Sequence, residues 1–235
     1  MHLYVCRLEG IEERLFDQLL GCLSKERQGH ILRFRSYEDR LRSLFGTLLT
    51  QMELAKQLQC EPSELAFQAN KFGKEELTSQ QLYFNISHAG RYVVCAIGDS
   101  PVGIDIEEKQ QRDFSLFQSI WTERERKCFQ VDTLEDFYYL WTAKESYVKW
   151  LGTGLSADLN SIDIIQSGSV YQDGKEVPVQ VQTFNIDEHY QGAVCSNCSI
   201  GKIQEVTVHQ VEKFFLERLS YEKYRSSDYD WQQQI

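Results

Sequence analysis

Two carboxylates stand two residues apart in a short segment that is otherwise apolar. The segment reads Val-Gly-Ile-Asp-Ile-Glu over residues 102–107. Because the side chains of a strand alternate between its faces, Asp105 and Glu107 share one face. Their charges repel unless water screens them or a cation lies between them. Mg²⁺ takes oxygen ligands of this kind and keeps waters that phosphates can replace. The segment alone favours the other interpretation, an exposed polar face.

A second charged group follows on a predicted helix, in the segment Trp-Thr-Ala-Lys-Glu-Ser-Tyr-Val-Lys-Trp of residues 141–150. At 100° per residue, Lys144 falls within the apolar stripe, Glu145 lies at its edge and Lys149 follows one turn later. A lysine in such a stripe is costly unless it reaches water or an acceptor. Glu145 and Lys149 either form an exposed pair worth about 0.3–0.5 kcal/mol, or join the metal and the phosphates. Periodicity leaves both interpretations open.

Residues able to bind an anion are spread through the first part of the chain. They are Arg27, His30, Arg40, Arg42, Lys74 and His88. Arginine binds phosphate through two parallel hydrogen bonds, and histidine can donate one. Each of these side chains alone is more simply a solvated surface residue. Together with metal-binding carboxylates, they would bind a cosubstrate that carries phosphates and Mg²⁺.

The elements that must position these residues mix helices with strands. Apolar periodicity and capping residues predict helices over 11–23, from Ser24, over 36–58, from Thr122, over 133–151 and over 211–220. Strands are expected over 3–7, 82–86, 91–97, 102–107, 162–165, 177–184, 191–196 and 203–209. The connections predict a loop at 70–81, a turn at 87–90 and an antiparallel meander over 82–107. The pattern indicates an α+β fold, with two similar units joined near residue 102.

Composition excludes several classes of protein. The chain has 235 residues, of which 14 are Gly and 3 are Pro, so it is neither collagen-like nor a Pro/Gly-rich disordered chain. A net charge of −10 argues against nucleic acid or an anionic membrane as the main partner. Neither a membrane span nor a signal peptide is expected. The cysteines are expected to be reduced thiols, and Cys195 and Cys198 lack the second pair of a structural zinc site.

Taken together, the motifs resemble the signature of the Sfp-type 4′-phosphopantetheinyl transferases. The matching motifs are F-N-I-S-H at 84–88, V-G-I-D-I-E at 102–107, W-x-x-K-E-S at 141–146, Lys149 and G-x-G-L at 152–155, with Gly73-Lys74 upstream. They occur in the order that the family has. The resemblance covers about residues 24–155, and beyond this range only the length and the strand pattern agree.

The resemblance implies two pseudo-symmetric α/β halves in one chain, residues 1–102 and 103–220, followed by a polar tail at 221–235. Coenzyme A and a metal site would lie at the interface of the halves. The implied reaction is Mg²⁺-dependent transfer, with Mn²⁺ as an alternative ion, of the 4′-phosphopantetheine arm of coenzyme A. The acceptor is a serine of an apo acyl or peptidyl carrier protein, and adenosine 3′,5′-bisphosphate is released.

The resemblance also implies roles for individual residues. Asp105, Glu107 and Glu145 match the metal ligands. Glu145 and Lys149 match the catalytic residues, the first as the proposed general base (a metal-bound water being the alternative) and the second as the lysine at the pyrophosphate. The implied coenzyme A contacts are Arg27, His30, Arg42, Ser43, Lys74, Ser87, His88 and Lys149. Arg27 and His30 stand where relatives often have lysines.

The carrier protein is expected to bind through residues 108–121. Because both proteins are acidic, apolar contact with modest salt dependence is expected. An amphipathic helix that packs on its own core explains these residues equally well. The chain is expected to be a cytoplasmic monomer that binds neither nucleic acid nor membrane.

Two other functions compete with the transferase. A metal-dependent nuclease is suggested by Asp99 or Asp105 with Glu107-Glu108-Lys109, which spells D…E-x-K. It would leave the segment 141–149 unexplained, and the chain lacks a basic stripe for nucleic acid. A non-catalytic protein that binds coenzyme A or phosphate would not need three carboxylates.

Overall fold

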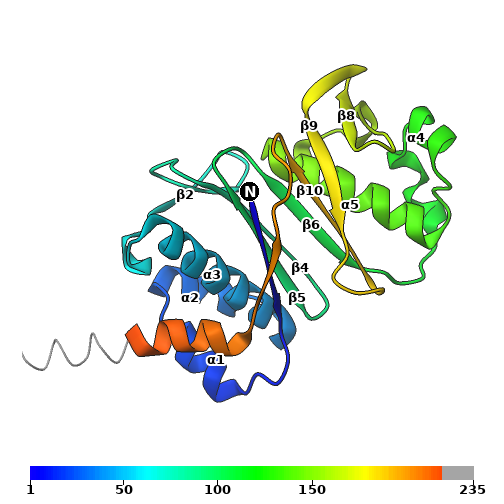
Figure 1. The fold of residues 1–235 in the computed structure, drawn as a ribbon. Helices are drawn as coiled ribbons and strands as arrows, with labels where there is room; N and C mark the ends of the chain where they lie inside the picture. The colour runs from blue at the N-terminus through cyan, green and yellow to red at the C-terminus, as the bar shows by residue number, and fades with distance from the viewer. Residues whose placement is uncertain (219–235) are drawn as a thin grey trace, which may run out of the picture.

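The computed structural model describes residues 1–218, which form four stacked layers (Figure 1). Four helices, three from the first part of the chain and one at residues 208–218, cover one face of a first sheet. A second sheet lies against its other face, and a long helix covers the second sheet. Buried apolar clusters fill the three spaces between the layers. This mixture of helices and mainly antiparallel sheets confirms the predicted α+β class.

The first sheet, here called the N-terminal sheet, has the strand order β11-β1-β5-β4. Its strands are β1 (His2–Arg7), β4 (Tyr83–Ala89), β5 (Tyr92–Gly98) and β11 (Ile203–Val206). Its helices are α1 (Glu13–Leu20), α2 (Lys25–Leu32) and α3 (Tyr37–Leu58). Ser24 and Ser36 cap the N-termini of α2 and α3, because each side chain accepts a hydrogen bond from a backbone N–H of the first turn.

The second sheet, here called the C-terminal sheet, has the order β6-β10-β9-β8-β7. Its strands are β6 (Gly103–Glu108), β7 (Ile162–Ile164), β8 (Ser169–Gln172), β9 (Lys175–Phe184) and β10 (Tyr190–Ser196). The helix that covers it is α5 (Leu134–Leu151), preceded by the 3₁₀ segment η2 (Phe114–Ile120) and by α4 (Glu123–Cys128). Smaller elements are η1 (Pro62–Glu64), β2 (Phe67–Ala69), β3 (Glu75–Leu77), η3 (Gly154–Ser156) and η4 (Leu159–Ser161).

Alternating side chains bury the N-terminal sheet on both faces. In β1, Tyr4 and Cys6 pack against the helices, whereas Leu3 and Val5 pack against the C-terminal sheet. The side chains of β5 and β10 are divided between two clusters in the same way. The contact between the sheets is therefore apolar along its length, and polar groups gather at one edge of it.

The predicted meander over 82–107 is wrong in its last strand. β4 and β5 pair antiparallel as expected, but β6 leaves this sheet and pairs antiparallel with β10. The short connection at 98–101 therefore links two sheets rather than two strands of one sheet. As a result, the strand that carries the two carboxylates lies at the junction of the sheets (Figure 1).

Several predicted boundaries also differ from the structure. The expected turn at 87–90 begins later, because β4 continues through His88 to Ala89. The expected loop at 70–81 contains β3, and β8 was not expected at all. The expected strand at 203–209 ends at Val206, and residues 208–218 are helical.

The last described segment of the chain returns to the N-terminal sheet. β11 pairs in parallel with β1, and Val211 and Phe215 are buried in the cluster beneath the first three helices. The predicted second half, 103–220, therefore contains a segment that packs with the first. The predicted end of the last helix and the polar tail at 221–235 lie outside the described residues. Among the helices of residues 1–218, none has the length and apolar character needed to cross a membrane.

Candidate active site between the two sheets

The edge strands β4 and β6 are joined by side chains rather than by a backbone ladder. Asn85 and Ser87 are two residues apart on β4 and therefore face the same side. The backbone N–H of Ile104 donates to Asn85 Oδ1 at 2.8 Å, and that of Ile106 donates to Ser87 Oγ at 3.4 Å. These bonds hold the strand that carries Asp105 against the N-terminal sheet.

Asp105 lies at the centre of the site, with only 6% of its side chain exposed. Its Oδ1 accepts hydrogen bonds from Ser87 Oγ at 2.9 Å and from Lys149 Nζ at 2.7 Å. Lys149 Nζ also donates to Ser87 Oγ at 2.9 Å, so the three side chains form what we call the polar triangle. The second oxygen, Oδ2, is buried and has no hydrogen-bond partner within residues 1–218. A buried oxygen of this kind is costly, and a cation or a donor on a ligand would satisfy it.

The close approach of α5 to β6 depends on a glycine. Any side chain at Gly103 would collide with the backbone of α5. Glycine lets the strand pack directly against the helix, and this brings Lys149 within reach of Asp105. The helix itself begins at the N-cap Thr133 and ends before Gly152, which adopts a left-handed φ of 69°.

Two further carboxylates lie close to Asp105. Glu107 Oε1 accepts a hydrogen bond from Trp141 Nε1 at 3.1 Å. Burial, and then the charge of Asp105, raise the pKa of Glu107, and the same two causes raise the pKa of Glu145. Lys149 opposes both shifts without cancelling them. The three negative groups therefore crowd one another, and a cation would relieve this crowding.

The three carboxylates provide the oxygen ligands that Mg²⁺ takes. As they stand, no three Asp, Glu, His or Cys side chains of residues 1–218 are grouped so that they could hold a metal ion. The ammonium of Lys149 contacts Asp105 Oδ1 in this arrangement. The donor chemistry and the unpaired Oδ2 fit a divalent cation, but Glu107 and Glu145 would have to turn toward Asp105 to complete its ligand set.

The raised pKa of Glu107 gives a prediction for stability in EDTA. The folded protein binds this proton more readily than the unfolded chain, whose pKa lies near the usual 4.5. The contribution of Glu107 to the free energy of unfolding is therefore greatest below the unfolded pKa and is lost as pH rises through the folded pKa. As pH rises above about 4.5, where the unfolded carboxyl ionises first, wild-type protein should therefore lose more stability than Glu107→Gln. Urea unfolding across this range measures the difference, and parallel profiles would contradict the prediction.

The expected contacts Arg42 and His88 approach the polar triangle from α3 and β4. Arg42 donates to Asp39 Oδ1 at 2.6 Å. His88 is accessible to solvent, yet surrounding protein atoms displace part of its hydration and lower its pKa, as do the nearby charges of Arg42 and Lys149. Ser43 follows Arg42 on α3, and its hydroxyl has no hydrogen bond within the part of the chain that is described. A histidine with two cations beside it is a suitable site for an anion.

Lys74 is bound to the protein backbone. Its Nζ donates to the carbonyl oxygens of Val102 at 3.1 Å and of Lys149 at 2.7 Å, and burial lowers its pKa. Asn70 Nδ2 adds a hydrogen bond to the carbonyl of Gly152 at 3.1 Å. The resemblance implies a phosphate contact for Lys74, whereas in the structure its ammonium stabilises the C-terminal end of α5.

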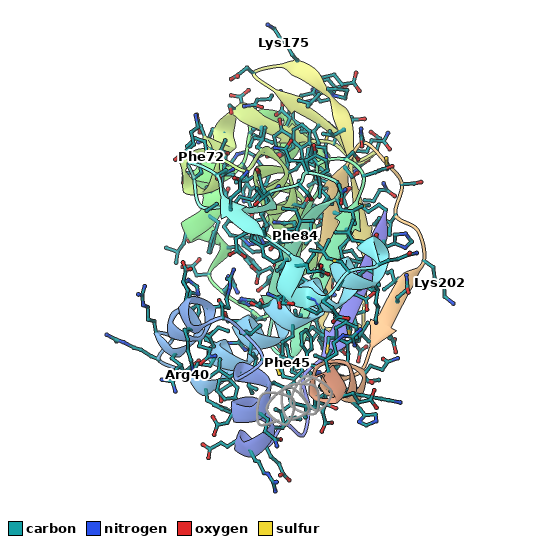
Figure 2. The ribbon with its side chains drawn as sticks, turned by 90° about the vertical axis from the view of Figure 1, so that its left-hand side faces the viewer. Arg40, Phe45, Phe72, Phe84, Lys175 and Lys202 are labelled. Atoms are coloured by element: carbon teal, nitrogen blue, oxygen red, sulfur yellow. The ribbon has the colours of Figure 1, made fainter. Side chains whose placement is uncertain are left out.

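Two hollows in the surface meet at Glu75, which lines both. The first, of about 300 Å³, is lined by Lys149 of the polar triangle, by the exposed Phe72 and by the buried Phe84, and Figure 2 labels these two phenylalanines. The second, of about 660 Å³, lies beside α2 and contains Arg27 and His30. Arg27 forms an ion pair with Glu75. Arg27 and His30, which were expected to contact coenzyme A, therefore lie in the second hollow and not at the polar triangle.

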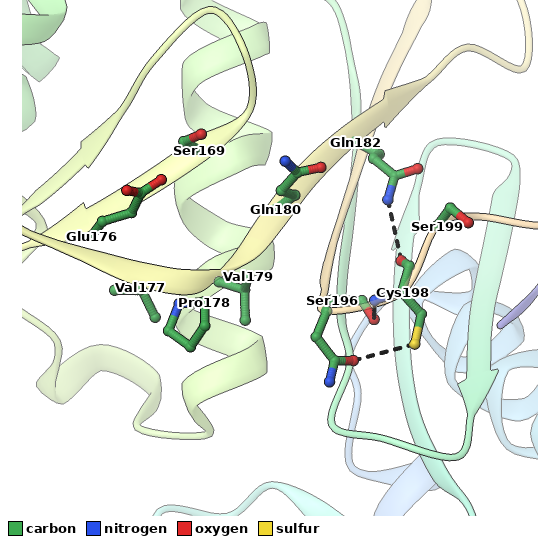
Figure 3. Close-up of a pocket in the computed structure, with 11 residues that line it drawn as sticks. Ser169, Glu176, Val177, Pro178, Val179, Gln180, Gln182, Ser196, Cys198 and Ser199 are labelled. Atoms are coloured by element: carbon green, nitrogen blue, oxygen red, sulfur yellow. Dashed lines mark hydrogen bonds between the residues drawn. The ribbon is translucent and has the colours of Figure 1, made fainter.

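A further hollow, of about 680 Å³, lies along β9 of the C-terminal sheet (Figure 3). Within it, Gln182 Nε2 donates to the carbonyl of Cys198 at 3.2 Å. Its lining contains none of the expected site residues and no charged side chain besides Glu176. Cys195 and Cys198 are both free thiols. This hollow therefore gives no support to a second reactive site.

The sequence motifs contain two residues whose role only the structure reveals, and they miss a third. Asn85 holds β6, and Trp141 holds Glu107. Arg112 lies near enough to Glu107 to oppose the rise of its pKa. Alternation along β4 could have indicated Asn85, which shares a face with Ser87. No spacing in the sequence pairs Trp141 or Arg112 with Glu107.

The nuclease alternative requires Lys109 beside the carboxylates of β6. In the structure, the Lys109 ammonium donates to both carboxylate oxygens of Glu135, at 3.1 and 3.0 Å. The lysine that contacts Asp105 is Lys149, which comes from α5. The D…E-x-K pattern is therefore not assembled as a site.

Comparisons with known proteins match both halves of the chain. A family described as "4′-phosphopantetheinyl transferase, N-terminal" matches residues 12–99, and the "4′-phosphopantetheinyl transferase superfamily" matches residues 101–195. The 4′-phosphopantetheinyl transferase gsp of Aneurinibacillus migulanus is 35% identical, over 83% of this chain and 87% of the relative. A 4′-phosphopantetheinyl transferase of Bacillus subtilis is 34% identical, and Sfp of Bacillus subtilis (strain 168) is 30% identical, each over 77% of this chain and 84% of the relative.

Proposed function

The chain belongs to the 4′-phosphopantetheinyl transferases, which transfer phosphopantetheine from coenzyme A to carrier proteins, and we propose that it uses Mg²⁺ and releases adenosine 3′,5′-bisphosphate. The observation that carries this proposal is the carboxylate group around Asp105, whose Oδ2 is buried without a partner among the described residues. A non-catalytic protein that binds coenzyme A would gain nothing from three crowded carboxylates. The cytoplasmic location and the monomeric state stay predictions.

We assign the metal to Asp105, Glu107 and Glu145. When bound, Mg²⁺ would neutralise charge on the pyrophosphate of coenzyme A and fix its position. Asp105 supplies the unpaired Oδ2, and Trp141 restrains Glu107 through the indole N–H. The raised pKa values of Glu107 and Glu145 support the assignment, because their causes are burial and the negative charge of Asp105.

We assign to Glu145 the role of general base. A carboxylate with a raised pKa is a stronger base than an exposed one, and a serine hydroxyl needs such a base. Glu145 accepts the hydroxyl proton, and the serine oxygen forms a bond to the phosphorus that bears pantetheine. The bond from this phosphorus to the bridging oxygen breaks, and its electron pair leaves with adenosine 3′,5′-bisphosphate. The Lys149 ammonium stabilises the charge that develops there.

Coenzyme A is proposed to extend over the two hollows that meet at Glu75. The groups available to it are Arg27, His30, Arg42, Ser43, Ser87, His88 and Lys149. The ion pair of Arg27 with Glu75 would have to open for Arg27 to bind a phosphate. Lys74 is proposed to shape the first hollow by holding α5, since its ammonium already contacts backbone carbonyls.

The reaction class is tested by mass spectrometry of an apo carrier protein. Incubated with the enzyme, coenzyme A and Mg²⁺, the carrier should gain one phosphopantetheine unit on serine. A carrier with Ser→Ala at the modified position is the control. EDTA should prevent the gain, and added Mg²⁺ should restore it. Equal modification in EDTA would overturn the metal assignment, and no modification of any apo carrier would overturn the reaction.

The carrier protein is proposed to dock on residues 108–121, next to the carboxylates. η2 in this segment exposes 76% of Leu116 while burying Phe114. Phe117 packs edge-on against Trp141, with ring centroids 5.7 Å apart. The segment therefore offers an apolar side chain to a partner, while Phe114 and Phe117 pack against Phe137 of α5.

Replacing Leu116 by serine should raise the KM for the carrier about tenfold. The reason is the loss of an exposed apolar contact, since Leu116 packs little against its own chain. The KM for coenzyme A should stay unchanged. Leu32→Ser on α2, which is 47% exposed, is the matched control and should change neither value. Steady-state kinetics at several salt concentrations measure both effects, and a steep salt dependence would count against apolar docking.

A further inference from the structure

Lys144 is a buried charged residue that has no role in the proposed chemistry. Its side chain is completely buried, and its Nζ lies 2.9 Å from Glu125 Oε2. The same Nζ donates to the carbonyl oxygens of Ile120 at 3.1 Å, Leu159 at 2.7 Å and Ile162 at 2.7 Å. The apolar stripe of α5 therefore contains a lysine that finds acceptors inside the protein rather than reaching water.

Glu125 is equally buried and equally well connected. Its Oε1 accepts from the backbone N–H of Ile164 at 2.9 Å, and its Oε2 accepts from that of Thr122 at 3.0 Å. Thr122 in turn caps Glu125 N–H, so the pair includes the first turn of α4. The Lys144–Glu125 pair thus joins α5 to the end of η2, to α4, to η4 and to β7.

Stability alone does not require an ion pair at this position. Removing two charges from water is costly, and well-packed apolar residues often replace a buried pair without loss of stability. What an apolar pair cannot do is to bind three carbonyls and two backbone N–H groups in fixed directions. The particular contribution of this pair is therefore to fix the position of the backbone groups that it binds.

The backbone held by the pair belongs to the proposed carrier surface. Ile120 ends η2, the segment that exposes Leu116. On α5, Lys144 immediately precedes Glu145, the proposed base. Lys144 therefore holds the docking segment through the carbonyl of Ile120, and the adjacent Glu145 lies near the Asp105 carboxylate.

We propose that the Lys144–Glu125 pair is a positioning device for the carrier protein. It holds the segment from η2 to α4 in one place relative to Glu145, so that a carrier docked on η2 presents its serine to this carboxylate. The inference rests on the proposed transfer reaction and on docking at residues 108–121. It assigns Lys144 and Glu125 no contact with substrate, so they are positioning residues rather than catalytic ones.

The decisive variant replaces both charges together, as Lys144→Met with Glu125→Met. Its melting temperature should fall less than that of Lys144→Met alone, because no charge is left buried alone, although three carbonyls and two backbone N–H groups lose their partners. The KM for the carrier should rise about tenfold or more, since small misplacements of reacting groups are costly. The KM for coenzyme A should stay unchanged, because neither residue lines the two hollows that meet at Glu75.

Controls separate positioning from loss of stability. Leu48→Ala, in the N-terminal core cluster, should lower the melting temperature without raising the carrier KM relative to that for coenzyme A. If the double variant does not fold, Thr122→Val decides the question, since it removes only the cap of α4. Thr122→Val should raise the KM for the carrier, but by less than the rise of about tenfold expected for the double variant. The KM for coenzyme A should again stay unchanged.

The outcomes separate this inference from the reaction on which it rests. A wild-type enzyme that modifies no carrier overturns the proposed function. An active wild type whose double variant keeps the wild-type carrier KM overturns the positioning role alone, as does an equal rise of both KM values. If Thr122→Val is the variant tested, an unchanged KM for the carrier overturns the positioning role. Hydrogen exchange should also increase in residues 114–128 of the double variant, while peptides of α3 keep their protection.

Discussion

Asp105→Asn is expected to lower transfer by about 10²- to 10³-fold. The carboxylate oxygen Oδ1 binds both Ser87 and Lys149, and Oδ2 is buried with no partner in the described part of the chain. The amide has nearly the same shape, but it removes the negative charge that pairs with Lys149 and that we assign to the metal. The variant should fold, because an amide oxygen can still accept the two hydrogen bonds.

The effect of Asp105→Asn is measured by the rate of carrier modification at saturating coenzyme A and Mg²⁺. Asp99→Asn is the matched control, because Asp99 is exposed at the end of the neighbouring loop. It should keep wild-type activity. Circular dichroism and the melting temperature verify that both variants fold. A rate for Asp105→Asn within a factor of about three of the wild type would remove this residue from the site.

Glu145→Gln is expected to lower transfer by about 10²- to 10⁴-fold, while the affinity for coenzyme A falls less. Glutamine cannot take the proton of the serine hydroxyl, and it is a weaker metal ligand than a carboxylate. The side chain of Glu145 makes no hydrogen bond or ion pair within residues 1–218, so its replacement leaves no protein donor unpaired. The loss should therefore appear in turnover rather than in folding.

Two measurements are needed for Glu145→Gln: the single-turnover rate of transfer and the dissociation constant of coenzyme A by calorimetry. Glu188→Gln, whose exposed side chain lies between β9 and β10, is the control and should leave both values nearly unchanged. Unaltered turnover of Glu145→Gln would exclude this residue as the base. A parallel loss of coenzyme A affinity and turnover would instead indicate that its main contribution is to binding.

The local patterns of the sequence predicted most of the elements near the site. Alternation along 102–107 placed Asp105 and Glu107 on one face of a strand, and caps such as Ser36 and Thr133 marked where helices begin. Such features depend on residues a few positions apart, so one segment contains all the information. The family resemblance added the order of the motifs, and the comparisons agree with it.

The partners of the charged side chains could not be predicted in this way. Helical spacing offers Glu145 as the partner of Lys149, yet the ammonium binds Asp105, which is 44 residues away in the chain. Lys74 looks like a free cation in the sequence but binds the backbone at the end of α5. Lys144 looks like an anomaly in an apolar stripe and instead has a buried counter-charge, Glu125.

By itself, then, the sequence determined the chemical groups of the site and the elements that carry them. Only the tertiary structure decided which groups meet, because β6 crosses to the second sheet and packs on α5 where Gly103 leaves room for the helix. That contact depends on two sheets and a helix that are distant in the chain. Within residues 1–218, the same packing leaves Asp105 Oδ2 buried without a partner, and this orphaned oxygen is what points to a cation.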